Sequence, residues 1–357
     1  MYEIAGFRSK QRIPVVTYFH QSSQCVLVRA AQPLVGLLKR HCTEDVALLN
    51  WYRAKEQATD DESKLYIFDL RSYAAAVANG AARGGGMEDV SLYTCTELVH
   101  SNLENIHAIR SSYNLLSDIV APGAGEEEVA YLYYTKLDES CWIKNIRAIL
   151  DCSIQVAERI HLERTSVVVR CSDGWDRTPQ VVSIVEIMLD PYYRTLEGIA
   201  VLIEKEWCGF GHKFQDRCGH GINHNTNADE KSPIFVQFLD CLMQLMSQFP
   251  NSFEFNGFLL IFLADHVNSG LFGNFLGNND KERRQKLNVH RLTQSVWSHV
   301  YEHSERFVNE DFEPYFDCIW PSTSVKQVRL WDRYYGRWDH KLHPNSLNAF
   351  DQWHDDW

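Results

Sequence analysis

One segment, residues 165–189, constrains the fold of this chain more than any other. Residues 165–169 are a short β-branched run, which is typical of a buried strand. A polar loop follows, and residues 179–189 then have the apolar character of a buried helix, with Pro179 near the first turn, where proline is tolerated. A helical pattern also precedes the strand. Helix, strand, loop and helix in this order predict an α/β fold with a parallel or mixed sheet covered by helices.

The loop has the sequence Cys171-Ser172-Asp173-Gly174-Trp175-Asp176-Arg177-Thr178. The N-terminus of the following helix presents free N–H groups and the positive end of its dipole. Five residues separate Cys171 from Arg177, so the loop can curl with its amides inward, and Gly174 permits a backbone conformation that other residues resist. We expect a cup for a tetrahedral anion, with a Cys171 thiolate at its base and Arg177 holding two phosphoryl oxygens.

This arrangement favours phosphoryl transfer through a cysteine. Cys171 attacks phosphorus, and water then hydrolyses the thiophosphoryl enzyme. Asp176 or Asp173 supplies the proton for the leaving alkoxide and then acts as base on the water, while Thr178 donates a hydrogen bond to the departing thiolate. The alternative is that Cys171 is a buried small hydrophobic residue, as most cysteines are. The polar, glycine-containing loop after a strand favours the catalytic interpretation.

The rest of the chain fits the same fold class. No linker divides it, so we expect one domain over residues 1–340 and a polar tail over residues 341–357. The longest apolar stretch, residues 255–264, is too short to span a bilayer. Further strands are expected at residues 13–18, 25–28 and 65–70, and further helices at residues 105–120, 139–163 and, within one mostly apolar stretch, 235–267.

The formal net charge of −12 argues against a nucleic-acid binder, which needs a basic face. An anionic substrate must therefore be gathered by a local basic pocket. The ten cysteines are scattered through a long chain that begins without a signal peptide, which favours reduced thiols in the cytosol.

The loop from Cys171 to Thr178 resembles the active-site loop of the myotubularin phosphoinositide phosphatases. The resemblance extends over nearly all of residues 7–340. The segments that carry it are 7–14, 32–33, 67–69, 76–79, 84–86, 105–107, 204–207, 210–212, 219–221, 253–256 and 330–338.

This resemblance implies a protein tyrosine phosphatase-like α/β fold with a central mixed sheet flanked by helices. It implies removal of the 3-phosphate from phosphatidylinositol 3-phosphate and phosphatidylinositol 3,5-bisphosphate, with no metal or other cofactor. By position, Cys171 is the nucleophile, Arg177 binds the scissile phosphate and Asp176 is the preferred general acid. The same resemblance assigns the substrate-binding positions Ser172, Asp173, Gly174 and Trp175 in the loop, the headgroup cations Lys213 and Arg217, and the polar positions Asn79 and Asn105.

The sequence departs from the family pattern in three places. Arg170 stands where the family usually has a histidine before the nucleophile, and position 213 is Lys rather than Arg, which keeps the charge but loses the planar fork. The family's membrane-binding PH-GRAM domain usually precedes this region, whereas only a few residues do so here. We therefore expect a phosphatase domain without that module.

The resemblance also implies a location and partners. The expected partners are phosphoinositide headgroups in membranes and other myotubularin chains, in homo- or hetero-oligomers, and the expected place is the cytoplasm, at the surface of endosomal membranes. Two other functions stay open: a catalytically silent phosphoinositide-binding adaptor that partners an active myotubularin, and a protein tyrosine phosphatase.

A second cluster of chemically active residues lies near Lys213. Its spacing matches no zinc-finger pattern, so we interpret it as pocket and loop residues rather than a metal site. Its members are Cys208, His212, Cys218, His220 and His224.

Overall fold

The computed structural model describes residues 1–36, 38–53, 64–121, 129–221 and 228–338. A sheet of five strands lies at its centre, in the order β1-β2-β5-β3-β4. β5 pairs in parallel with β2 and β3, β3 pairs in parallel with β4, and β1 is antiparallel to β2. The strands are β1 (Val15–His20), β2 (Cys25–Ala31), β3 (Leu65–Asp69), β4 (Thr96–His100) and β5 (Ser166–Cys171).

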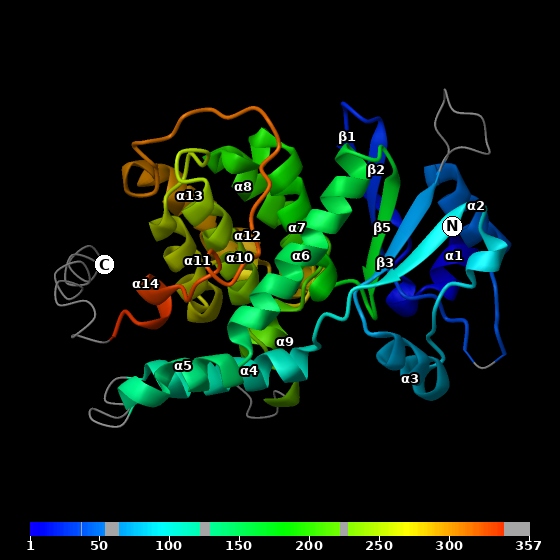
Figure 1. Ribbon diagram of the computed structural model, residues 1–357, viewed down its shortest axis with the longest axis horizontal. Helices are drawn as coiled ribbons and strands as arrows, with labels where there is room; N and C mark the ends of the chain where they lie inside the picture. The colour runs from blue at the N-terminus through cyan, green and yellow to red at the C-terminus, as the bar shows by residue number, and fades with distance from the viewer. Residues whose placement is uncertain (37, 54–63, 122–128, 222–227, 339–357) are drawn as a thin grey trace.

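Helices cover both faces of this sheet, as Figure 1 shows. The larger layer, which contains α6, α7, α10 and α11, packs on one face, and α2 packs on the other. The α-helices are α1 (Tyr2–Phe7), α2 (Thr43–Arg53), α3 (Tyr73–Arg83), α4 (Ile106–Val120), α5 (Val129–Glu139), α6 (Trp142–His161), α7 (Arg177–Leu189), α8 (Leu196–Ile203), α9 (Phe214–Cys218), α10 (Ile234–Gln248), α11 (Gly257–Ser269), α12 (Val289–Leu292), α13 (Val296–Glu302) and α14 (Asp332–Tyr335).

The central strand β5 is buried along its whole length because both of its faces are covered. Val167 and Val169 point into the large helical core, whereas Val168 joins the smaller cluster under α2. This alternation explains why the strand is a continuous β-branched run rather than an alternating pattern. The mixed α/β sheet expected from the sequence is confirmed.

Two expectations for the helices and strands need correction. The apolar stretch 235–267 is two helices, α10 and α11, because Pro250 lies in the turn between them and Asn256 caps the second with its side chain. The edge strand β4 was not expected: its Thr-Glu-Leu-Val-His sequence is only half-buried and lacks a strong apolar signal.

The C-terminal part of the described chain is mostly irregular. After α13 it crosses the helical layer as the orange coil at the top of Figure 1, and it ends near α14. The expected tail, residues 341–357, lies outside the described residues, so the domain end at residue 340 stays a prediction. Within the described part of the chain, none of the helices has the length and apolar character needed to cross a bilayer.

Candidate active site

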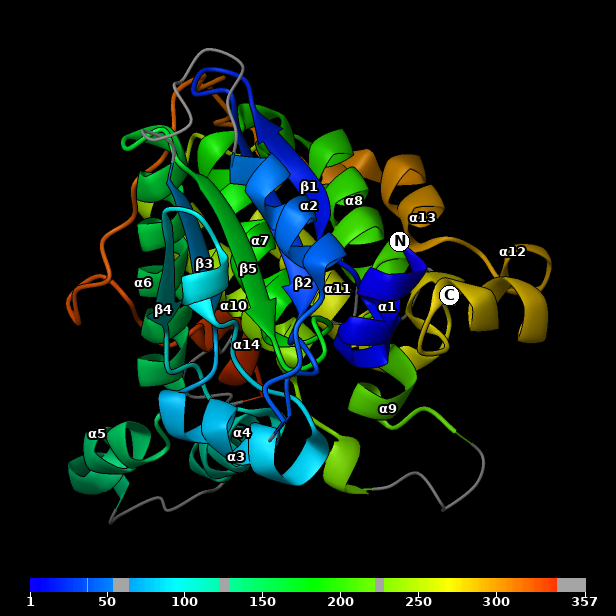
Figure 2. The ribbon, with the colours of Figure 1, turned by 90° about the vertical axis from the view of Figure 1, so that its right-hand side faces the viewer.

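The loop of residues 172–176 joins the carboxyl end of β5 to the start of α7, in the middle of the sheet. In Figure 2, α3, α4 and α9 surround the end of the sheet at which β5 stops. The carboxyl ends of parallel strands and the N-terminus of the following helix form the usual place for an anion site in such sheets. The sequence-predicted loop therefore lies where the fold concentrates positive potential.

Cys171 lies at the base of this loop and is almost completely buried. Its Sγ accepts hydrogen bonds from the Gly174 backbone N–H at 3.2 Å and from the Thr178 hydroxyl at 3.3 Å. Both hydrogen bonds hold the sulfur at the base of the loop, beside the first turn of α7. The loop thus curls around the sulfur, and Thr178 has the hydrogen bond to it that the sequence predicted.

The carbonyl of Gly174 points away from the cup toward two arginines. Arg29 donates to it at 2.7 Å and Arg12 at 3.3 Å. Because these guanidinium groups hold the carbonyl outward, the neighbouring amide can face the sulfur. Sequence reasoning missed this role, although Arg12 belongs to the basic run at residues 7–12.

Arg177 begins α7, next to the loop. Its guanidinium donates to the Leu103 carbonyl at 3.1 Å and to the Ser172 hydroxyl at 3.5 Å. The side-chain amide of Asn79, on α3, approaches the same hydroxyl at 3.4 Å. Arg177, Ser172 and Asn79 therefore lie together at the cup, in positions suited to phosphoryl oxygens.

Asp176 is buried and forms a bidentate ion pair with Arg217, with both N–O distances at 2.9 Å. Burial acts to raise the pKa of Asp176, but the charge and hydrogen bonds of Arg217 outweigh it and hold that pKa below its usual value. The third guanidinium nitrogen of Arg217 binds Glu230 at 2.8 Å. All three nitrogens of Arg217 thus contact protein groups. Its expected binding of a second phosphate stays a prediction.

His212 is a buried neighbour of this pair. Its Nδ1 lies 2.6 Å from the Trp175 carbonyl, which can only accept, so Nδ1 carries the proton. Burial lowers the pKa of His212 to about 4, so the ring is neutral at pH 7. The histidine therefore fixes the loop carbonyl without adding charge.

Lys213 lies at the mouth of the loop and is partly exposed. Its Nζ binds Asp216 at 2.8 Å and lies 5.0 Å from the centre of the Trp175 ring. Arg12 approaches the same ring at 5.8 Å. Of the two expected headgroup cations, Lys213 is the one whose charge remains accessible to a ligand.

Two other expected site residues bind protein groups. Asp173 accepts a hydrogen bond from the Ser9 hydroxyl at 2.7 Å, so its carboxylate anchors the loop to the N-terminal segment. Asn105 is the N-cap of α4, and its side-chain oxygen accepts from the N–H groups of His107 and Ala108. The structure brings Asn105 near the cup only through Leu103, two residues earlier, which contacts Arg177.

A network of buried charges lies behind the loop. Arg170 bridges Asp69, at 3.0 Å, and Glu88, and no part of these three side chains is exposed. Glu88 also binds Arg8 at 2.9 Å, and Asp69 binds Arg71 at 2.9 Å. With Asp45, which pairs with Arg8, three arginines balance three carboxylates. The unusual residue before the nucleophile is therefore neutralised within the core.

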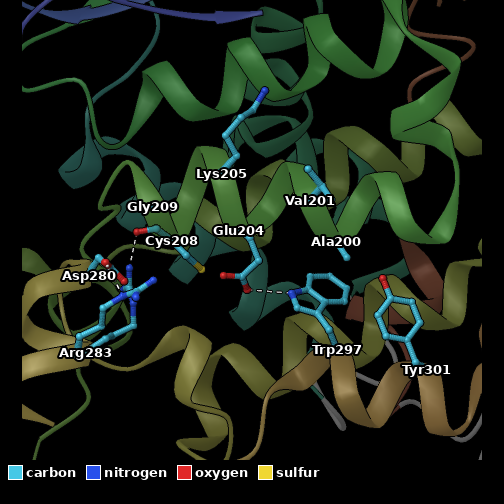
Figure 3. A pocket seen from close by; sticks show the side chains of 11 residues that line it. Ala200, Val201, Glu204, Lys205, Cys208, Gly209, Asp280, Arg283, Trp297 and Tyr301 are labelled. Carbon is cyan, nitrogen blue, oxygen red and sulfur yellow. Dashed lines mark hydrogen bonds and ion pairs between the residues drawn. The ribbon is translucent and has the colours of Figure 1, made fainter. Parts of the chain in front are cut away.

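A separate cavity lies away from this loop. It has a volume of about 560 Å³ and is formed by α8, the π-helical turn Glu204–Gly209 and α13. Figure 3 shows Glu204 bound to the Trp297 indole and Arg283 bound to the Cys208 carbonyl. None of its lining residues belongs to the loop 171–178, so it is not the catalytic cup.

The cysteine and histidine cluster near Lys213 does not form a metal site among the described residues. His212 contacts Trp175, and Cys208 donates to the Asn274 carbonyl. His224 lies outside the described residues.

A parallel strand that ends in a buried cysteine, a curled five-residue loop and a helix that begins with arginine define a cysteine-dependent phosphatase fold. The family model of the myotubularin-like phosphatase domain matches residues 1–284. The chain belongs to this family, as the resemblance implied.

Known relatives agree with this assignment. The phosphatidylinositol-3,5-bisphosphate 3-phosphatase MTMR2 of Bos taurus is 42% identical over 353 residues, which cover 96% of this chain and 52% of that protein. Myotubularin of Xenopus tropicalis is 40% identical over 351 residues, which cover 98% of this chain and 57% of that protein. The chain therefore spans about half the length of the curated relatives it matches.

Proposed function

We propose that this chain is a phosphatase that removes the 3-phosphate of phosphatidylinositol 3-phosphate and phosphatidylinositol 3,5-bisphosphate. The observation that carries the proposal is Cys171, whose sulfur accepts two hydrogen bonds at the base of a loop that ends on Arg177. The printed name of the bovine relative supports the choice of an inositol lipid.

The chemistry follows from the geometry. The Cys171 sulfur attacks phosphorus, the sulfur–phosphorus bond forms and the bond to the inositol oxygen breaks. Arg177 and the loop amides stabilise the charge on the phosphoryl oxygens. Water then cleaves the cysteinyl phosphate, and phosphate leaves.

The leaving inositol oxygen needs a proton, and Asp176 is the candidate donor in the loop, since the Asp173 carboxylate accepts a hydrogen bond from Ser9. Arg217 holds the pKa of this Asp176 carboxyl below its usual value. We infer that phosphate of the bound lipid competes for Arg217, after which Asp176 can take up a proton. Lys213, partly exposed beside Trp175, adds positive charge at the mouth of the cup.

The direct test is phosphate release from short-chain phosphatidylinositol 3-phosphate. We expect turnover by the wild-type chain, none by Cys171→Ser, and normal turnover by Cys95→Ser, which removes an exposed thiol as a matched control. Equal release by wild type and Cys171→Ser would overturn the proposal.

A catalytically silent adaptor is the second candidate, because the ion pair with Arg217 favours the ionised form of Asp176, which has no proton to donate. Binding to vesicles that contain phosphatidylinositol 3-phosphate, with no phosphate release at any pH, would favour the adaptor. Turnover that depends on Cys171 excludes it.

A protein tyrosine phosphatase would use the same loop without the headgroup cation. Lys213→Ala separates the two functions, since it leaves the Asp176 pair in place. The lipid function predicts a loss on bisphosphorylated lipid and little change on a small aryl phosphate, whereas equal losses would count against headgroup recognition. Lys64→Ala, which removes an exposed lysine that also forms an ion pair, is the control.

We also propose that the chain acts in the cytoplasm at the surface of endosomal membranes, as a homo- or hetero-oligomer with other myotubularins. The family assignment supports this location and these partners. With a net charge of −12, electrostatic attraction to an anionic membrane must come from another module or chain. Co-purification with a second myotubularin, and recruitment to vesicles only in its presence, would support the proposal.

A further inference from the structure

Three side chains of the types that bind metal ions lie close together at the end of the sheet opposite the catalytic loop. His20 is the last residue of β1, His161 is the last residue of α6, and Cys318 lies in the irregular segment after α13. One possible ligand atom from each residue lies within 4.8 Å of those of the other two. Because the three residues are far apart in sequence, no spacing pattern could have predicted this cluster.

The distances match those between ligands of one tetrahedral ion. His161 Nδ1 lies 3.2 Å from His20 Nε2 and 3.4 Å from Cys318 Sγ. Zinc bonds of about 2.0–2.1 Å to nitrogen and about 2.3 Å to sulfur place tetrahedral ligands about 3.3–3.6 Å apart. The three donor atoms are thus already spaced for a shared ion, and a thiolate with two imidazoles is a donor set that zinc prefers.

We propose that His20, His161 and Cys318 form a structural zinc site. A water molecule completes the tetrahedral coordination of these three protein ligands. His20 is buried, whereas His161 and Cys318 are half-buried, so an ion can enter from the surface.

The protons have defined destinations when the ion binds. The Ser23 backbone N–H donates to His20 Nδ1 at 3.2 Å, so His20 Nε2 carries the ring proton and donates a hydrogen bond to His161. On zinc binding this proton moves to Nδ1 and is donated to the Ser23 hydroxyl oxygen, 2.9 Å away, while the Ser23 backbone N–H gives up its hydrogen bond to Nδ1. Cys318 releases its thiol proton to solvent and binds as the thiolate. The Ser23 hydroxyl then orients the His20 ring.

The site would fasten the irregular C-terminal segment to the sheet. In Figure 1 this segment is the orange coil that crosses the helical layer. Around Cys318 the segment is held by backbone hydrogen bonds, in which Ile319 donates to Met188 and Arg194 donates to the carbonyls of Tyr315 and Asp317. The Ile319 side chain is also buried in the core. A metal bond to Cys318 would link this segment to β1 and α6, two elements that it follows by more than a hundred residues.

Cobalt titration tests the site directly. All variants carry Cys171→Ser, so that the catalytic thiol cannot bind the ion. We expect a single equivalent of Co²⁺ to give the visible bands of a tetrahedral site and a thiolate-to-cobalt charge-transfer band, both displaced by Zn²⁺. Cys318→Ser should remove the charge-transfer band and His161→Gln should weaken binding at least tenfold, whereas Cys95→Ser should change neither. Spectra that persist in Cys318→Ser would overturn the proposal.

Limited trypsin digestion provides a second readout. Lys326 and Arg329 are exposed in the irregular segment. We expect Zn²⁺ to slow cleavage after them in the Cys171→Ser protein, but not when this protein also carries His161→Gln. Circular dichroism without metal checks that each variant folds, and since His161 is half-buried we expect His161→Gln to keep its fold. Equal protection of both proteins by Zn²⁺, or none in either, would also overturn the proposal.

Discussion

At the scale of single residues, Gly174 is the loop position with no room for a side chain. Its φ is +76°, and an added Cβ would lie 2.8 Å from the Ala30 carbonyl oxygen. A strained backbone of this kind costs about 1–3 kcal/mol. The backbone N–H of Gly174 donates to Cys171, and its carbonyl accepts from Arg29. Any movement of the Gly174 backbone therefore disturbs the cup.

We therefore expect Gly174→Ala to lower kcat on a small aryl phosphate by at least tenfold and to lower the free energy of unfolding by about 1–3 kcal/mol. Steady-state kinetics and urea unfolding measure the two effects. Gly6→Ala is the control, because nothing lies within 4 Å of a Cβ there. Unchanged kinetics in Gly174→Ala would show that the loop tolerates the shift.

Arg217 controls the ionisation of Asp176. Burial alone raises the pKa of this carboxyl, and the Arg217 charge reverses the shift. We expect Arg217→Gln to raise the pKa of Asp176. If Asp176 is the proton donor, the alkaline limb of the pH profile of kcat should then move to higher pH, because Asp176 stays protonated up to a higher pH.

The pH dependence of kcat on phosphatidylinositol 3-phosphate measures this shift. Lys213→Ala, which leaves the Asp176 pair intact, should keep the wild-type limb. Superimposable limbs for Arg217→Gln and wild type would contradict the assignment of Asp176 as general acid.

At the scale of secondary-structure elements, Arg170 connects strands that carry the site. Asp69 lies opposite Arg170 in the pairing of β3 with β5, and Glu88 follows α3. Burial opposes the ionisation of both acids, yet the Arg170 charge holds the pKa of each below its usual value. A neutral side chain at position 170 would leave two buried carboxylates with one cation fewer.

We expect Arg170→Met to lower the free energy of unfolding by about 3–5 kcal/mol, the usual loss when one partner of a buried ion pair is removed. Urea unfolding at pH 7 measures it. Arg284→Met removes an arginine that is mostly exposed and pairs with Asp280, so its loss should stay within about 1 kcal/mol. Similar small losses in both variants would show that the buried network is not stabilising the sheet.

At the scale of the whole molecule, buried histidines set the stability in mild acid. His212 has a pKa of about 4 in the folded chain against 6.5 for an ordinary histidine. Its neutral form is favoured on folding, so the stabilisation is complete above pH 6.5 and is lost as pH falls toward 4. Burial also lowers the pKa values of His20, His220, His266 and His299.

We expect the urea midpoint of the wild-type chain to fall between pH 6.5 and 4, with His212 contributing about 3 kcal/mol of this loss. His212→Phe keeps an aromatic ring between Trp207 and Phe214 and should make the urea midpoint depend less steeply on pH. His107→Phe, at an exposed position, should not. Identical slopes for His212→Phe and wild type would contradict a buried neutral ring.

The sequence by itself determined the central strand, the helix after it and the order of the loop residues between them. These features are local: a β-branched run, a glycine, a proline in the first turn and an apolar helical face act within one segment of chain. The α/β fold followed from the same segment, and the family followed from its loop together with the other segments that resemble the family. The helices α4 and α6 were predictable because their apolar residues recur at helical spacing.

Only the tertiary structure decided which distant charges meet. Arg217 forms an ion pair with Asp176, and Arg12 and Arg29 donate to the Gly174 carbonyl. Arg170 is surrounded by carboxylates. At the other end of the sheet, three side chains come together: His20, His161 and Cys318. The physical reason is that an ion pair or a ligand cluster depends on distances across the sheet and between layers, which residue spacing does not encode. The sequence identified the residues that can do the chemistry, and packing assigned each of them its partner.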